Sequence, residues 1–189
     1  MTRIRSVLLG AACLTLCVST SANAAVLVFG TGPAKDCFNV AEFGGNAHEG
    51  VEFCDAALEG PLTSSDRAAT LVNRGVIRLR DHDNERALAD INAGIAIDSS
   101  LGDAYVDRGA ASIALGHYDD ALADLNKGLS LGPHSPQVAY YDRAIIYERN
   151  GDVRAAYEDY KKALDIAPGF TPAADELKRF HVVRKSSGA

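Results

Sequence analysis

Beyond its N-terminal leader segment the sequence has no long apolar run, and this absence excludes one class of protein. The apolar run of the leader, Val7 to Val18, is about a dozen residues long, and no later stretch approaches the ~20 apolar residues that a membrane-crossing helix needs. We therefore expect no direct membrane span after the leader.

The leader itself has the three parts of a secretory signal. Arg3 and Arg5 give a positive start, Val7 to Val18 forms the apolar run, and Ala22-Asn23-Ala24 is a small-x-small cleavage site. We predict a signal peptide over residues 1–24, cleavage after Ala24, and a soluble mature protein that is periplasmic or secreted. An uncleaved leader, which would tether the protein, is the alternative.

Positive charge is scarce. The chain has 19 Lys and Arg against 25 Asp and Glu, a formal net charge of −6, and no basic cluster. Because an acidic surface repels a phosphate backbone, nucleic acid is not an expected partner.

Cysteine is also scarce once the leader is set aside, since only Cys37 and Cys54 remain. An even number of cysteines in an exported protein predicts a disulfide between these two. Two buried thiols are the alternative. A zinc site would need two further ligands at short spacing, so no metal site is predicted.

Motifs of catalysis are absent. The sequence contains no GxSxG, no HExxH, no phosphate-binding glycine loop and no acidic ladder with calcium-loop spacing. His82, His117 and His134 fall in predicted turns. We therefore expect no catalytic residue and no cofactor, and predict that the protein is not an enzyme.

The informative feature that is present is a repeat at offsets of 34 and 35 residues. It relates Asn73-Arg74-Gly75 to Asp107-Arg108-Gly109 and to Asp142-Arg143-Ala144. The same offsets relate Ala87 to Ala121 and Ala156, Asp90 to Asp124 and Asp159, and Gly94 to Gly128 and Ala163.

Each repeat contains two apolar stripes at helical spacing, separated by a short polar turn. Ser100 is a predicted N-cap, and Pro133 and Pro168 close second helices. Small residues such as Gly109 recur where two helices of one hairpin would approach closely. We expect a leucine at Gly109 to overpack the hairpin.

The period, the small residues and the closing prolines resemble the tetratricopeptide repeat, in three units at about 68–101, 102–136 and 137–170. The match departs from the family at the first helices, where only Tyr105 and Tyr140 stand in for a tryptophan, and at Ser99, which replaces a closing proline. The resemblance implies an all-α, right-handed superhelical solenoid of helix-turn-helix hairpins.

Segments on either side of the three units complete the expected array. Residues 25–67 are interpreted as a degenerate unit, with a first helix over Ala34 to Phe43 and a second helix around Gly50 to Leu58, stapled by the predicted disulfide. Residues 171–189 are expected to form a C-terminal capping helix, from Thr171 to about Val183, and a short tail.

The recurrent arginines and aspartates favour a scaffold role. A residue that every unit repeats serves a need of every unit, such as an ion pair between helices, whereas recognition of a partner needs positions that differ. Solvation of a helix surface is another such need. The arginines concerned are Arg74, Arg108 and Arg143, and the aspartates are Asp90, Asp124 and Asp159.

In the family that the sequence resembles, first helices line the concave face, which implies a groove for a protein or peptide partner. Its acidic edge favours an extended or helical peptide with apolar anchors and a Lys or Arg, and disfavours the acidic C-terminus of a chaperone. Burial of single valines and isoleucines in the core is the alternative. The candidate binding residues are Val72, Asn73, Val76, Leu79, Val106, Asp107, Ala110, Ile113, Tyr141, Asp142, Ile145 and Glu148.

The functional hypothesis is therefore a non-enzymatic adaptor of the cell envelope. Two alternatives stay open. The chain could be a self-associating or structural subunit of an envelope assembly, or an accessory subunit of an enzyme complex.

Overall fold

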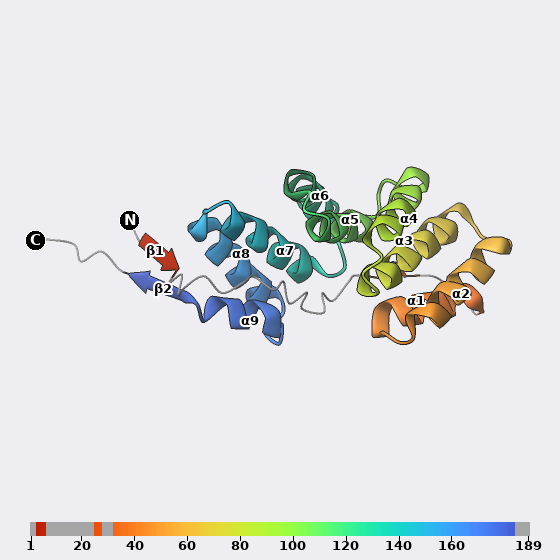
Figure 1. Cartoon of the computed structure of the whole chain (residues 1–189), viewed down its shortest axis with the longest axis horizontal. Helices are drawn as coiled ribbons and strands as arrows, with labels where there is room; N and C mark the ends of the chain where they lie inside the picture. The colour runs from red at the N-terminus through yellow and green to blue at the C-terminus, as the bar shows by residue number, and fades with distance from the viewer. Residues whose placement is uncertain (1–2, 7–24, 28–31, 184–189) are drawn as a thin grey trace, which may run out of the picture. The chain divides into compact units, whose positions relative to one another are not determined.

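The computed structural model describes residues 3–6, 25–27 and 32–183, with backbone alone at 3–6 and 181–183 (Figure 1). Apart from two four-residue strands, the regular structure in this part of the chain is helical, which confirms the all-α class. None of the described helices is both long and apolar enough to cross a membrane. The elements are β1 (Arg3–Ser6), α1 (Pro33–Phe43), α2 (Ala47–Glu59), α3 (Ser64–Arg80), α4 (Asn84–Ile97), α5 (Gly102–Ala114), α6 (Tyr118–Leu131), α7 (Pro136–Arg149), α8 (Val153–Ile166), α9 (Thr171–Leu177) and β2 (Phe180–Val183).

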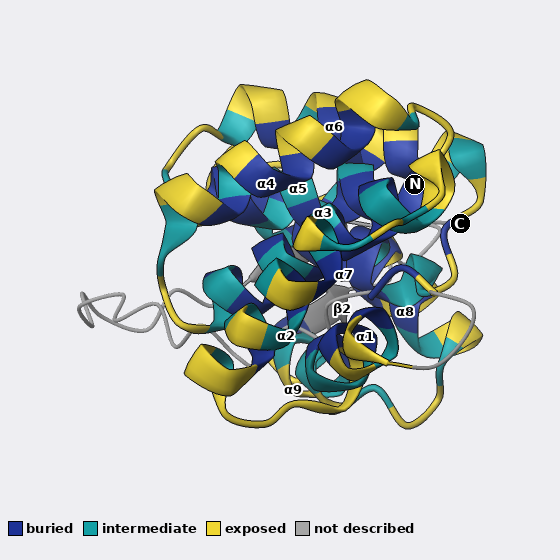
Figure 2. Cartoon of the chain, turned by 90° about the vertical axis from the view of Figure 1, so that its right-hand side faces the viewer, coloured by how far each residue is buried: buried dark blue, intermediate teal, exposed yellow. Residues whose placement is uncertain are grey.

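Neighbouring helices pair as hairpins in two compact units. One unit, residues 22–135, contains the hairpins α1–α2, α3–α4 and α5–α6. The other, residues 1–21 with 136–189, contains the hairpin α7–α8 together with α9 and the two strands. In Figure 2, α4 and α6 each present an exposed side to solvent and bury the opposite side, as an amphipathic helix does.

Glycines allow the two helices of a hairpin to approach closely. A Cβ added at Gly109 would lie 2.9 Å from Cγ of Leu125, and one at Gly75 would lie 2.6 Å from Cγ1 of Ile91. Both distances are shorter than a carbon–carbon contact allows, so the predicted close approach is confirmed.

The turn between the two helices repeats one backbone conformation in the hairpins α3–α4, α5–α6 and α7–α8. Gly116 and Gly151 have φ of 81° and 79°, and His82 takes the same left-handed conformation with φ of 60°. His82, His117 and His134 all lie between helices, as predicted. This explains why a glycine is favoured at the position that His82 occupies.

The predicted N-cap at Ser100 is wrong. Ser100 instead donates from its backbone N and from Oγ to Oδ1 of Asp98, at 2.9 and 2.6 Å, and Leu101 stands at the N-cap position of α5. The Asp98 carboxylate competes successfully for the serine because it lies only two residues away in the same turn.

The predicted disulfide between Cys37 and Cys54 is confirmed. It joins α1 to α2, with 4.9 Å between the two Cα atoms, and both cysteines are fully buried. The bridge closes the hairpin that lies at the start of the array.

The C-terminal helix is shorter than predicted, so its predicted end is wrong. The helix α9 ends at Leu177 rather than near Val183, and β2 pairs antiparallel with β1 in the register Ser6↔Phe180 to Arg3↔Val183. Two adjacent valines after a buried aromatic favour a strand over a further helical turn.

The strand β1 lies within the segment predicted to be a signal peptide. The cleavage site at Ala22 to Ala24 is outside the described residues, and removal of the leader stays a prediction. Cleavage there would also remove the strand that pairs with β2.

Loss of the disulfide should destabilise the first hairpin. Replacing both Cys37 and Cys54 with alanine should lower the free energy of unfolding by about 3 kcal/mol, because the open chain gains conformational entropy. Urea unfolding followed by circular dichroism measures this. A reductant should lower the stability of the unmodified protein and leave that of the double variant unchanged. Equal stability of the two proteins in the absence of reductant would contradict the prediction.

Gly109→Leu should cost about 1 to 3 kcal/mol of stability, since its side chain would meet Leu125. Gly169→Leu is the matched control, because nothing lies within 4 Å of a Cβ at that loop position. Thermal unfolding compares the two variants. A Gly109→Leu protein as stable as the control would show that the hairpin can open without cost.

Candidate peptide-binding face

The predicted groove residues lie on the first helices α3, α5 and α7, and most of them are buried. Ala110, Ile145 and Glu148 are partly exposed. The buried ones are Val72, Asn73, Val76, Leu79, Val106, Asp107, Ile113, Tyr141 and Asp142.

Some of the buried valines pack within their own hairpin. Cγ2 of Val72 lies 2.6 Å from the position of a Cβ at Gly94, and Cγ2 of Val106 lies 2.8 Å from that at Gly128. These two side chains therefore contribute to packing between first and second helices, and their role as ligand contacts stays a prediction.

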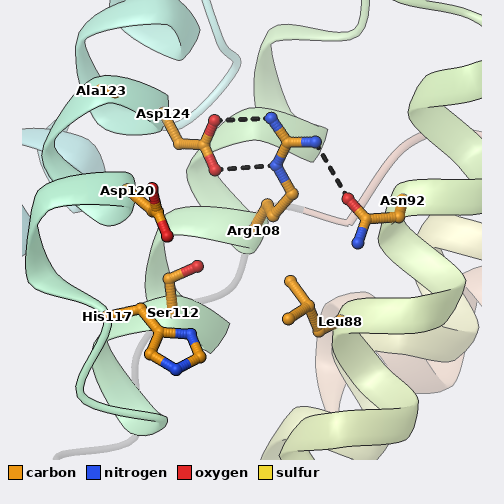
Figure 3. A pocket seen from close by; sticks show the side chains of 8 residues that line it. All are labelled: Leu88, Asn92, Arg108, Ser112, His117, Asp120, Ala123 and Asp124. Carbon is orange, nitrogen blue, oxygen red and sulfur yellow. Dashed lines mark hydrogen bonds and ion pairs between the residues drawn. The ribbon is translucent and has the colours of Figure 1, made fainter.

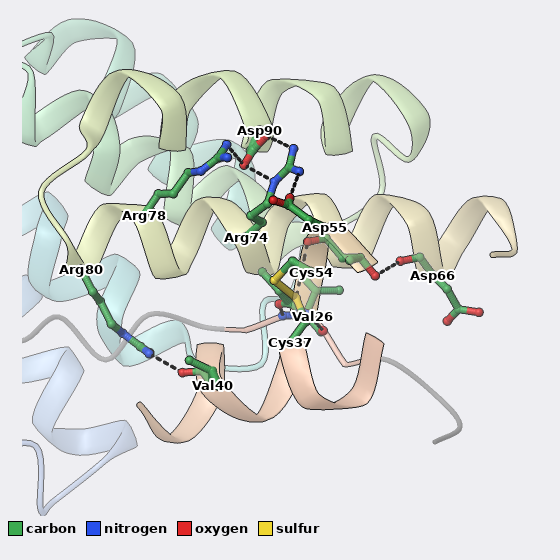
Figure 4. Close-up of a disulfide and its surroundings, with 12 residues drawn as sticks. Val26, Cys37, Val40, Cys54, Asp55, Asp66, Arg74, Arg78, Arg80 and Asp90 are labelled. Atoms are coloured by element: carbon green, nitrogen blue, oxygen red, sulfur yellow. Dashed lines mark hydrogen bonds and ion pairs between the residues drawn. A yellow bond between two sulfur atoms is a disulfide. The ribbon is translucent and has the colours of Figure 1, made fainter. Parts of the chain in front are cut away.

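Asn73 holds a segment of the chain itself. Its Oδ1 accepts from the backbone N of Val26 at 2.7 Å, and its Nδ2 donates to the backbone O of Val26 at 2.8 Å. Figure 4 draws Val26 beside the disulfide, and Val26, Cys37 and Cys54 belong to one apolar cluster. Sequence reasoning chose Asn73 but missed Val26, because the two residues are 47 positions apart.

The next repeats carry Asp107 and Asp142 at the position of Asn73, and both carboxylates are buried. The negative charge of Asp107 attracts the guanidinium of Arg80. This guanidinium also donates a hydrogen bond to the backbone O of Val40 at 2.9 Å. Burial lowers the pKa of Arg80, and the charge of Asp107 opposes that shift.

Asp142, on α7, carries a buried carboxylate oxygen without a hydrogen bond in the described structure. Its Oδ2 has no hydrogen-bond partner within the described residues, and only 4% of the residue is exposed. Burial raises the pKa of Asp142 to about 7. A ligand that brought an N–H donor or a cation to this carboxylate would remove the unfavourable burial.

Tyr141 belongs to an aromatic cluster of the unit that contains α7. Its ring centroid lies 5.7 Å from that of Tyr160 and 5.5 Å from that of Phe170. Burial raises the pKa of Tyr160, whose hydroxyl donates to Oε2 of Glu148 at 3.3 Å. Glu148 also accepts two hydrogen bonds from Arg179, both at 2.9 Å, so its negative charge is balanced locally.

The recurrent arginines and aspartates form ion pairs inside each hairpin, which confirms their scaffold role. Nε and Nη2 of each arginine donate to the two carboxylate oxygens of one aspartate. The distances are 2.8 and 2.6 Å for Arg74 with Asp90, 2.7 and 2.6 Å for Arg108 with Asp124, and 2.7 and 3.0 Å for Arg143 with Asp159.

Two of these arginines also reach the second helix of the preceding hairpin. Nη1 of Arg74 donates to Asp55 on α2 at 2.5 Å, and Nη1 of Arg108 donates to Asn92 on α4 at 2.9 Å. Each of these two guanidinium groups therefore joins three helices. The hydrogen bond to Asp90 raises the pKa of Arg74, and the one to Asp124 raises the pKa of Arg108.

A pocket of about 290 Å³, lined by polar and apolar side chains, lies where α4 meets the hairpin α5–α6 (Figure 3). The pair of Arg108 and Asp124 forms part of its wall, which limits the positive charge that a ligand would meet there. Its lining residues are Leu88, Asn92, Arg108, Ser112, His117, Asp120, Ala123 and Asp124.

The comparison with protein families agrees with this architecture. Residues 138–170, which span most of α7 and α8, match the family model described as tetratricopeptide repeat. The crystal structure of MamA superposes with a TM-score of 0.60 at 19% identity, covering 79% of this chain and 82% of that one. Residues 138–170 thus match a tetratricopeptide repeat, and the chain has the helical-hairpin fold of the proteins that it superposes on.

Other tetratricopeptide-repeat structures have the same fold. The crystal structure of YrrB, described as having an unusual peptide-binding site, superposes with a TM-score of 0.59 at 19% identity and covers 76% of this chain and 71% of YrrB. The second domain of human RPAP3 in complex with an HSP70 peptide gives 0.55 at 24% identity, over 61% of this chain and 96% of that domain.

Curated relatives share only part of their length with this chain. Sperm-associated antigen 1 of Mus musculus is 31% identical over 124 residues, which are 61% of this chain and 14% of that protein. Photosystem I assembly protein Ycf3 of Cyanophora paradoxa is 32% identical over 76 residues, which are 39% of this chain and 44% of that protein. The chain thus spans less than half of each relative.

The buried carboxylate of Asp142 should make stability depend on pH. Its pKa is about 7 in the folded protein, against the ordinary aspartate value of 3.8, so the folded state holds a proton that the unfolded state has lost between these values. Stability therefore falls as the pH rises from 4 to 7 and no further above it. Relative to the unmodified protein, Asp142→Asn should gain about 2 to 3 kcal/mol between pH 5 and pH 7.5.

Urea unfolding at the two pH values measures the effect. Asp175→Asn is the control, since the Asp175 side chain is 68% exposed. Equal pH dependence in the unmodified protein and in Asp142→Asn would show that Asp142 is ionised without cost in the folded state.

Proposed function

We propose that this chain is a non-enzymatic adaptor, which binds a peptide or a partner protein through the first helices of its hairpins. The observation that carries the proposal is the pair of hydrogen bonds between the Asn73 amide and the backbone of Val26. A side chain of this face is already arranged to hold a peptide backbone.

The charge of the face favours one class of ligand. Asp107 and Asp142 replace Asn73 in the following repeats, and Oδ2 of Asp142 lacks a hydrogen-bond donor in the described structure. A peptide with apolar residues and a Lys or Arg would supply that donor, whereas an acidic peptide would add repulsion. RPAP3, which is solved with an HSP70 peptide, is the relative in fold that supports binding of peptides as such.

Two features support action outside the cytosol. The leader has the composition of a secretory signal, and the disulfide between Cys37 and Cys54 suits an oxidising compartment. We therefore place the adaptor in the periplasm or outside the cell, where it would work without a cofactor.

Photo-crosslinking in the native host tests this function. A probe at Ile145 suits the face better than one at Tyr141, because Ile145 is partly exposed and Tyr141 is buried. The matched control is Glu158, which is exposed on the second helix of the same hairpin. We expect a discrete adduct with a second protein from Ile145 and none from Glu158, and a several-fold weaker adduct when Asp142→Asn is added.

A third probe separates the structural alternative. Ala123 is exposed on α6 and lines the pocket between α4 and the hairpin α5–α6. Adducts from Ala123 or Glu158 alone, or adducts only with a second copy of the chain, would contradict the adaptor and favour a self-associating or structural subunit.

A further inference from the structure

The short segment of residues 25–27, here called the strap, lies outside the helical hairpins and is hydrogen-bonded to Asn73 on α3. Ala25 and Val26 are each only 7% exposed and belong to the apolar cluster formed with α1, α2 and α3. Leu27 is 44% exposed, so burial of the strap ends after Val26.

The contact to Asn73 recognises backbone rather than side chain. One residue, Val26, offers both its N–H and its C=O to the same amide, at 2.7 and 2.8 Å. A residue in an extended chain presents these two groups on one side, as in an antiparallel strand pair. Any extended segment can make the same two bonds, and the apolar surroundings select a small apolar side chain at this point.

The site also needs an occupant. Asn73 is fully buried, and a buried amide without its hydrogen bonds is unfavourable. The strap is held by these two hydrogen bonds and by the burial of Ala25 and Val26, whereas the helices around it are held by the disulfide and the ion pairs of Arg74. The strap is thus the part that can leave while the site stays intact.

We propose that the surface of α1 and α3 around Asn73 is a binding site for an extended peptide with small apolar residues, and that the strap fills this site in the resting protein. An incoming peptide displaces the strap and takes over both hydrogen bonds of Asn73. This inference rests on the proposed adaptor function and names the ligand class and the resting occupant of one part of the face.

The test uses the full chain and a fluorescent, N-acetylated peptide with the sequence of residues 25–32. Val26→Pro releases the strap because proline has no N–H to donate to Asn73. Fluorescence anisotropy should show at least tenfold tighter binding of the peptide to Val26→Pro than to the unmodified chain, since the strap no longer competes. Adding Asn73→Ala to Val26→Pro should abolish that gain.

Two further variants keep the test decisive. Val26→Asp releases the strap by a different cause, an ionised side chain in the apolar cluster, and should give the same gain if Val26→Pro fails to fold. Val26→Ala retains the N–H and the small apolar side chain, and should bind the peptide as weakly as the unmodified chain.

Equal affinity of the released and unmodified chains, or binding that survives Asn73→Ala, would overturn the strap as an occupant of a peptide site. That failure is distinct from failure of the adaptor function. Adducts from Ile145 on α7 report on a different hairpin and do not depend on the strap.

Discussion

The paired hydrogen bonds from one arginine to one aspartate inside each hairpin are the interaction on which the rest of this structure depends. Arg108 and Asp124, in the middle repeat, are largely shielded from solvent, with 25% and 12% of their side chains exposed. The two parallel hydrogen bonds between a planar guanidinium and a carboxylate are directional, so the pair helps to orient the two helices. The glycines beside it then let the helices touch.

This arrangement leaves the first helices to hold other groups. Arg74 and Arg108 each also bind the preceding hairpin, which holds their own helix in position. The residue directly before each arginine, Asn73 or Asp107, is therefore held in position as well. Asn73 uses that place to hold Val26, and Asp142 buries a carboxylate at the corresponding place. The scaffold and the candidate site are thus neighbouring residues in sequence with separate tasks.

Recurring features, and a disulfide between the two cysteines outside the leader, could be predicted from the sequence, whereas a contact between a unique segment and a repeat could not. The period, the ion pairs and the close approach at Gly109 follow from residues repeated at the same offsets, and the disulfide follows from a single pair of cysteines. The contact of Val26 with Asn73 joins a unique segment to a repeat, and nothing in the spacing indicates it. Ser100 was mistaken for an N-cap because a serine before a helix has two competing partners, and the backbone conformation at Asp98 decides between them.

Hydrogen exchange at the Val26 amide tests the central claim, that the first-helix face holds a peptide backbone through Asn73. In the unmodified protein this amide should exchange far more slowly than in an unstructured chain, and Asn73→Ala should remove the protection while amides within α6 keep theirs. A Val26 amide that exchanges at the rate of an unstructured chain in the unmodified protein would contradict the account.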